Sequence, residues 1–147
     1  MPEDDAVDAL GGYPHRAPFS TRWNDNDVYG HVNNTVHYLA MDTVINAWMI
    51  EHAGLVIGPD GDGPVGLCVE SGCRYLASFE YPDTIEVGLR VARIGTSSVT
   101  WELAMTRGDG TLIAEGTFVH VFVDRQARTP TPIPAPARSA MESLVAG

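Results

Sequence analysis

The segment from Asn33 to Gly54 constrains the fold more than any other part of this 147-residue chain. Asn33 or Asn34 is a suitable N-cap and Gly54 a suitable helix end, so the segment predicts about 20 helical residues. Apolar side chains lie on nearly every side of that helix. A helix without a wide polar face must be covered on most of its sides. In a small domain, a sheet that curls around the helix provides this cover with the fewest elements.

The segments around the helix can supply that sheet. They combine β-like composition with alternation of apolar and polar residues, and hairpin-type turn residues connect the last two. One helix followed by antiparallel strands gives an α+β fold, with a curled antiparallel sheet around one long central helix. The strands are expected at residues 19–23, 65–76, 83–94, 98–107 and 111–124.

The length of the chain fits one compact domain. Residues 1–16 combine acidic side chains with Gly and Pro and offer little apolar surface, which predicts a flexible N-terminal arm. Residues 17–147 then form a single domain with a Pro-rich C-terminal tail, in which a short helix is expected at residues 138–145. The N-terminus shows neither the basic nor the apolar region of a signal peptide.

The net charge of −10 argues against broad contact with nucleic acid or an anionic membrane surface, because both need a basic footprint. No apolar run approaches the roughly 18 residues of a membrane span. The two cysteines, Cys68 and Cys73, do not resemble the disulfide framework of a small secreted protein. We therefore expect a cytoplasmic protein without nucleic-acid or membrane partners.

Carboxylate, imidazole and amide side chains are concentrated at the start of the predicted helix, in the stretch NDNDVYGHVNN. The stretch opens like a calcium-binding loop, but Tyr29 and Val36 stand where such a loop needs oxygen ligands. His31 and His37 have no Cys or third His close by to complete a zinc site. The sequence therefore predicts neither a metal site nor a cofactor.

Two interpretations of this stretch stay open. In the first, the Asn residues and Asp25 only order the loop and cap the helix, and Gly30 serves backbone geometry. In the second, a carboxylate beside the unpaired N–H groups of a helix start forms an active site for acyl transfer. There the N–H groups polarise a carbonyl, while the carboxylate attacks the acyl carbon or activates water.

A resemblance to hot-dog-fold acyl-CoA thioesterases, the 4-hydroxybenzoyl-CoA thioesterase-like superfamily, is carried by the segment RWNDNDVYGHVNNTVHYLAMDTVIN. It continues through VESGCRYLASFEYPDTIEVGLRVARIGTSSV to the strand GTFVHVFVD and the PTPIPA tail, roughly residues 17–137. The resemblance implies the hot-dog fold, in which a curled sheet wraps one long helix. It also implies hydrolysis of an acyl-CoA thioester to a free acid and CoA.

The resemblance places the catalytic carboxylate at Asp27, as nucleophile or as general base towards water. It places the helix-start N–H that polarises the thioester carbonyl at Asn34. His31 matches a histidine that orients the site or helps the leaving thiolate, and Tyr29 is a further candidate for substrate contact. His37 stands where relatives usually carry Tyr, which changes a wall of the acyl pocket.

The resemblance places the CoA contacts at the turn between two predicted strands. There an arginine can pair with a phosphate, and the N–H groups of the turn can cradle one. A curled sheet with one open edge and little depth for a ligand predicts a homodimer, with acyl chain and CoA near the subunit interface. The resemblance also implies dimers of dimers, and an acyl-carrier protein in place of CoA stays open. The candidate contact residues are Arg93, Gly95, Thr96, Ser97 and Ser98.

Two other functions stay open. The first is an acyl-thioester hydratase or dehydratase that uses His31 with Asp27 as acid and base, although the G-H-F-P type motif of dehydratases is absent. The second is a non-catalytic acyl-thioester-binding protein, in which the polar stretch only caps the helix. The identity of the acyl group depends on the packing of Trp48, Tyr75, Phe79 and Trp101.

Overall fold

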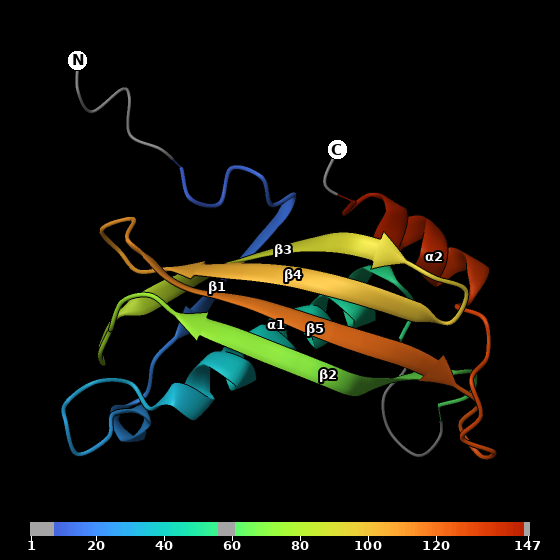
Figure 1. The fold of residues 1–147 in the computed structure, drawn as a ribbon, viewed down its shortest axis with the longest axis horizontal. Helices are drawn as coiled ribbons and strands as arrows, with labels where there is room; N and C mark the ends of the chain where they lie inside the picture. Colours follow the sequence, from blue (N-terminus) through green and yellow to red (C-terminus); the bar gives the residue numbers. More distant parts are fainter. Residues whose placement is uncertain (1–7, 56–60, 146–147) are drawn as a thin grey trace.

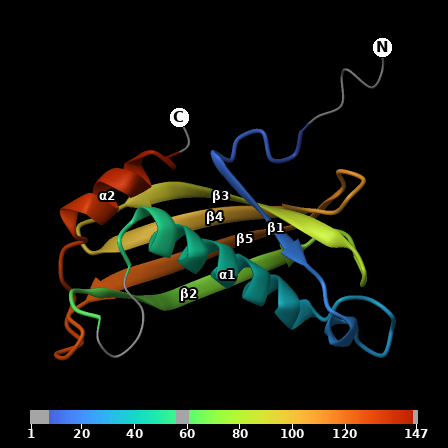
Figure 2. The same cartoon turned by 180° about the vertical axis from the view of Figure 1, so that it is seen from behind.

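A computed structural model describes residues 8–55 and 61–145 of the chain. Five strands form one antiparallel sheet in the order β1-β3-β4-β5-β2, and the helix α1 lies along one face of it (Figures 1 and 2). This arrangement confirms the α+β class and the antiparallel sheet, with the helix on one face of it. The elements are β1 (His15–Ser20), the 3₁₀ turn η2 (Trp23–Asp25), α1 (Asn34–His52), β2 (Val65–Tyr75), β3 (Thr84–Ile94), β4 (Ser98–Thr106), β5 (Leu112–Val123) and α2 (Ala135–Glu142).

Both ends of α1 follow the predicted capping residues. The side chain of Asn33 accepts a hydrogen bond from the Thr35 N–H at 3.0 Å, which makes Asn33 the N-cap. At the other end the Ala53 N–H donates to the Met49 carbonyl, and Gly54 takes the left-handed conformation with φ 75°. Local capping chemistry therefore fixes where the helix begins and ends.

The core lies between α1 and the sheet. Ala40, Met41 and Ile45 of the helix are fully buried there. Gly116 of β5 leaves room for the Met41 sulfur, because a Cβ at position 116 would lie only 2.3 Å from that sulfur. The opposite side of α1 is open, because Leu39 and Ile50 are each 46% exposed. The prediction that the helix is covered on most sides is wrong for a single chain, since the sheet curls along only one side of it.

The N-terminal segment differs from the predicted flexible arm where the structure describes it. Leu10 is 1% exposed, Arg16 forms an ion pair with Asp8, and β1 already begins at His15. The first strand was expected at residues 19–23, but β1 ends at Ser20 and Trp23 lies in η2. Every residue of β1 pairs with β3, so residues from His15 onward form a strand although their composition did not predict one. Residues 1–7 of the predicted arm lie outside the described residues.

The C-terminal helix begins earlier than predicted. α2 covers Ala135–Glu142 rather than residues 138–145, with Pro134 as its N-cap and Pro136 in its first turn. Proline is accepted in a first helical turn because the N–H that it lacks would have no partner there. After α2 the Val91 N–H donates to the Leu144 carbonyl, which ties the tail to β3. Neither helix of the described chain is long and apolar enough to cross a membrane.

Candidate active site

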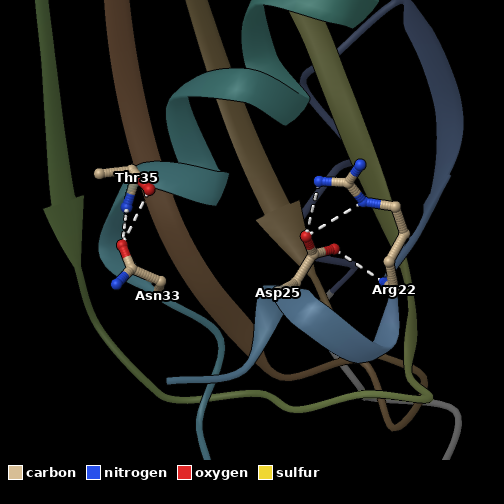
Figure 3. A network of polar contacts seen from close by, with 4 residues as sticks. All are labelled: Arg22, Asp25, Asn33 and Thr35. Atoms are coloured by element: carbon tan, nitrogen blue, oxygen red, sulfur yellow. Dashed lines mark hydrogen bonds and ion pairs between the residues drawn. The ribbon is translucent and has the colours of Figure 1, made fainter. Parts of the chain in front are cut away.

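The loop before α1 starts at a buried carboxylate. Asp25 is 3% exposed, and its carboxylate accepts hydrogen bonds from the Arg22 backbone N–H at 2.7 Å and from the Arg22 guanidinium at 2.9 and 3.2 Å (Figure 3). Its backbone carbonyl also accepts from the Asn33 N–H at 2.8 Å, which ties the start of the loop to the start of α1. Asp25 is therefore a structural residue, as the first interpretation of the polar stretch predicted.

The tip of the same loop is a tight turn built on Asp27. The Asp27 N–H donates to the His31 carbonyl at 2.8 Å, and the Gly30 N–H donates to the Asp27 carbonyl at 3.1 Å. Gly30 has φ 82°, a conformation that glycine adopts without strain. Oδ1 of the half-buried Asp27 side chain accepts from the Tyr29 N–H at 2.8 Å. None of the residues described by the structure donates a hydrogen bond to Oδ2, so this oxygen is available to a ligand or water.

The first residue of α1 offers a free donor. The N–H groups of Thr35 and Val36 are taken by the side chain and the carbonyl of Asn33. The Asn34 N–H has no acceptor among the described residues, as is usual at a helix start. The helix dipole adds partial positive charge at the same point. A carbonyl oxygen placed there would gain a hydrogen bond and a favourable field.

The carbonyl of Asn34 is held from two sides. The Tyr75 hydroxyl donates to it at 3.1 Å across 41 residues of sequence, and Nδ1 of His37 lies 3.2 Å from it. Burial lowers the pKa of His37, although its hydrogen bonds to the backbone of Asn34 and Asn33 oppose that shift. Desolvation, together with the neighbouring Cys73 and Tyr38, raises the pKa of Tyr75 to about 12. At neutral pH the imidazole is therefore neutral and the phenol keeps its proton.

A groove of about 400 Å³ runs between the loop and the segment that follows β2. It brings together four of the predicted site residues, of which His31 and Tyr29 are exposed at its rim. The facing wall had been predicted only in part, through Tyr75 and Phe79. The groove is lined by Asp27, Tyr29, His31, Val32, Asn34, His37, Tyr75, Leu76, Ala77, Ser78 and Phe79.

Two of the aromatic residues expected to shape the pocket belong to the core instead. Trp48 and Trp101 are 4% and 0% exposed, and their rings meet edge to face at 5.6 Å. Nε1 of Trp101 donates to Nδ1 of the buried His120 at 2.9 Å, a pairing that the sequence pattern did not indicate. Tyr75, at the end of β2, and Phe79, in the segment that follows, do line the groove.

The predicted CoA turn lies at the other end of the sheet (Figure 1). β3 begins beside the loop, where the Thr21 N–H donates to the Asp83 carbonyl at 3.3 Å. Its 11 residues then extend for about 33 Å before the turn begins. One chain therefore does not bring the turn residues Arg93, Gly95, Thr96, Ser97 and Ser98 together with Asp27.

The turn itself is tightly built. The Gly95 N–H donates to the Ser98 carbonyl at 2.7 Å, and a Cβ on Gly95 would lie 2.6 Å from the Ser98 hydroxyl. The carbonyls of Gly95 and Thr96 accept from Arg138 of α2, and the Ser97 carbonyl accepts from β5. Arg93 is exposed, and its side chain makes no hydrogen bond or ion pair with any residue that the structure describes. It is available to an anionic group.

The described residues contain no group of three His, Cys, Asp or Glu side chains that could hold a metal ion. What the groove does contain is a carboxylate with one available oxygen and a helix-start N–H without an acceptor. This set of groups suits attack on a polarised carbonyl. This is the acyl-transfer chemistry of the second interpretation, in which the polar stretch forms an active site.

Comparison with known proteins gives the family. The model of the thioesterase-like superfamily matches residues 21–141, so the chain belongs to this superfamily. No curated protein sequence matches the chain significantly.

Solved structures show the same fold. The crystal structure of the PA5185 protein from Pseudomonas aeruginosa is 46% identical, with a TM-score of 0.88 over 94% of this chain and 96% of the other. The PA2801 protein of the same organism is 32% identical, with a TM-score of 0.78 over 87% and 98%. A Thermus thermophilus thioesterase complexed with coenzyme A and zinc is 27% identical, with a TM-score of 0.76 over 92% and 96%.

Proposed function

We propose that the protein is an acyl-CoA thioesterase whose essential carboxylate is Asp27. One observation carries the proposal: the available oxygen of Asp27 and the free N–H of Asn34 belong to residues that line the same groove. Membership of the thioesterase-like superfamily supports thioester chemistry. The coenzyme A bound by the Thermus thermophilus relative supports CoA as the acyl carrier. We further propose that the enzyme works in the cytoplasm.

In the proposed reaction the thioester carbonyl oxygen accepts a hydrogen bond from the Asn34 N–H. Asp27 either attacks the acyl carbon or removes a proton from a water molecule that attacks it. Negative charge then develops on the carbonyl oxygen, where the helix dipole stabilises it. The C–S bond breaks, and the thiolate leaves and takes up a proton. Where Asp27 is the nucleophile, water then hydrolyses the acyl-Asp27 anhydride, so by either route the products are a carboxylic acid and CoA. His31 at the rim is placed to assist the leaving thiolate.

We propose that two copies of the chain complete the CoA site. β2 is an open edge strand of 11 residues without proline, and Val69 on it is 61% exposed. The other edge, β1, is short and carries Pro18, which discourages further pairing. Antiparallel pairing of β2 with the partner's β2 would turn the partner end for end. The partner's Arg93 turn would then lie at the same end of the joined sheet as Asp27.

Thiol release from a panel of acyl-CoAs tests the reaction. We expect turnover of at least one short, long or aromatic member by the wild-type protein, with free acid and free thiol formed in equal amounts. Loss of water from a 3-hydroxyacyl thioester without thiol release would instead establish a dehydratase. Binding of acyl-CoA with no turnover of any member would support a non-catalytic binding protein. An acyl-carrier protein loaded with the same acyl groups shows whether CoA is the carrier.

Subunit complementation tests the shared site. Asp27→Asn and Arg93→Ala proteins are mixed under conditions that exchange subunits. If each site combines residues of both copies, about a quarter of all sites regain both wild-type residues, and kcat/KM rises above that of either variant alone. No gain on mixing, with exchange verified by mass spectrometry of tagged subunits, would contradict a site shared between copies.

A further inference from the structure

His37 is a groove residue that the proposed reaction does not use. Its side chain is almost completely buried, at 4% exposure, on the first turn of α1. Its ring stands edge-on to Tyr75 and Phe79, with centroids 4.8 and 5.1 Å away and interplanar angles of 87° and 80°. These two aromatic neighbours and the helix backbone leave the imidazole little freedom to turn.

The hydrogen bond of His37 determines where its proton lies. Nδ1 is 3.2 Å from the Asn34 carbonyl oxygen, which can only accept, so Nδ1 carries the proton and donates. In a neutral imidazole the other nitrogen, Nε2, then has no proton and is a hydrogen-bond acceptor.

Nε2 has no partner among the residues that the structure describes. Among the described residues, every side-chain nitrogen or oxygen that is fully buried has a hydrogen-bond partner. Nε2 has none, so it belongs to the small part of His37 that is accessible. Because His37 lines the Asp27 groove, the accessible part of its ring faces that groove. The groove therefore contains a fixed, uncharged acceptor beside the rings of Tyr75 and Phe79.

We infer that His37 is a specificity-determining residue whose Nε2 accepts a hydrogen bond from a hydroxyl group on the acyl chain. The inference rests on the proposed thioesterase function and names its substrate class, namely acyl-CoAs with a hydroxyl close to the thioester. His37 follows Asn34 by three residues, so their Cβ atoms are neighbours about 5–6 Å apart on one face of the helix. A hydroxyl on the second or third carbon of the acyl chain is therefore within reach when the carbonyl lies at the Asn34 N–H.

The preference follows from the cost of covering Nε2. A plain hydrocarbon chain displaces water from this nitrogen and returns no hydrogen bond, whereas a hydroxyl replaces the lost one. Sites built to bond a hydroxyl discriminate strongly against analogues that lack it. For this single bond we expect kcat/KM to favour the hydroxylated substrate by roughly ten- to a hundredfold.

The test compares 3-hydroxybutyryl-CoA, as separate R and S forms, with butyryl-CoA. Wild-type protein should prefer one hydroxylated form at least tenfold in kcat/KM. His37→Phe removes the acceptor and should bring the ratio to about one, while His37→Gln restores a carbonyl acceptor and part of the preference. Tyr75→Phe is the matched control, because it removes the other hydrogen bond to Asn34 but leaves Nε2 in place, so the ratio should persist. A wild-type ratio near one, or a ratio unchanged in both His37 variants, would overturn the inference.

Failure of the proposed function gives a different result. If no acyl-CoA is hydrolysed, the proposed acyl-CoA thioesterase activity is refuted, and the hydrogen bond is then measured by binding. Non-hydrolysable thioether analogues of 3-hydroxybutyryl-CoA and butyryl-CoA are titrated by calorimetry against wild type and His37→Phe. Tighter binding of the hydroxylated analogue by wild type alone would uphold recognition by His37. Equal affinities would overturn it independently of catalysis.

Discussion

The two halves of the loop before α1 use the same residue type in opposite ways. At its start, Asp25 is buried and accepts three hydrogen bonds from Arg22. At its tip, Asp27 is half-buried and accepts one, from the Tyr29 N–H. A carboxylate whose oxygens are all occupied holds the chain in place, whereas one with an available oxygen can act on a ligand. Hydrogen-bond partners, and not residue type, therefore separate the structural carboxylate from the reactive one.

The sharpest prediction concerns the tip. Asp27→Asn keeps an oxygen that can accept from the Tyr29 N–H, so the turn should persist, but the amide can neither attack an acyl carbon nor take a proton. We expect kcat to fall by about a thousandfold, the range lost with a positioned base or nucleophile. Thiol release measures the rate, and thermal unfolding should give a melting temperature close to that of the wild type. A variant retaining a tenth of the activity would show that Asp27 is not essential.

The second prediction concerns the start of the loop. Asp25→Ala leaves the Arg22 backbone N–H without its acceptor. The Arg22 side chain is 64% exposed, so its guanidinium can form hydrogen bonds with water instead. Discounted for that exposure, the expected loss is about 2 kcal/mol of unfolding free energy. Urea unfolding measures it. A stability equal to that of the wild type would contradict the structural role of Asp25.

The third prediction concerns the residue that joins the two halves to the helix. The side chain of Asn33 accepts from both the N–H and the hydroxyl of Thr35, at 3.0 and 2.8 Å (Figure 3). Asn33→Ala should cost about 1 kcal/mol of stability, as is usual for a lost N-cap. Thr35→Val is a control that removes only the hydroxyl bond and should cost less. Equal losses in the two variants would contradict the assignment of Asn33 as N-cap.

The smallest expected effect concerns pH and two buried histidines. Burial lowers the pKa of His37 and of His120 below the ordinary 6.5, with Asp42 partly opposing the shift at His120. Below about pH 6.5 the unfolded chain therefore binds protons that the folded chain does not, and stability falls as the pH decreases. Urea unfolding between pH 8 and pH 5 should show this decline, and His37→Gln should reduce its slope. A pH-independent stability over this range would refute the assignment of neutral, buried histidines.

The sequence predicted the parts of the structure that local patterns determine. Asn33 and Gly54 bound α1 because capping depends on a few adjacent residues, and the four strands after it follow from alternation of apolar and polar residues. The start of β1 at His15 could not be predicted, because it depends on pairing with β3. The early start of α2 could not be predicted either, because proline is accepted in the first turn of a helix although the composition disfavours one.

The candidate site was predicted on one side only. The polar stretch and the resemblance pointed to Asp27, Asn34 and His31, which lie along one groove. The opposite wall depends on contacts across the chain, such as the bond from Tyr75 to the Asn34 carbonyl, which no local pattern records. For the same reason the sequence could not show that the Arg93 turn lies at the far end of the sheet.

The most direct test compares Asp27→Asn and Asp25→Ala side by side, with kcat/KM for the best acyl-CoA and the unfolding free energy measured for both. We predict opposite patterns: Asp27→Asn loses activity and keeps its stability, while Asp25→Ala loses stability and retains more activity per folded molecule. If Asp27→Asn hydrolyses the substrate as fast as Asp25→Ala does, Asp27 is not the reacting carboxylate, and the proposed function of the groove is contradicted.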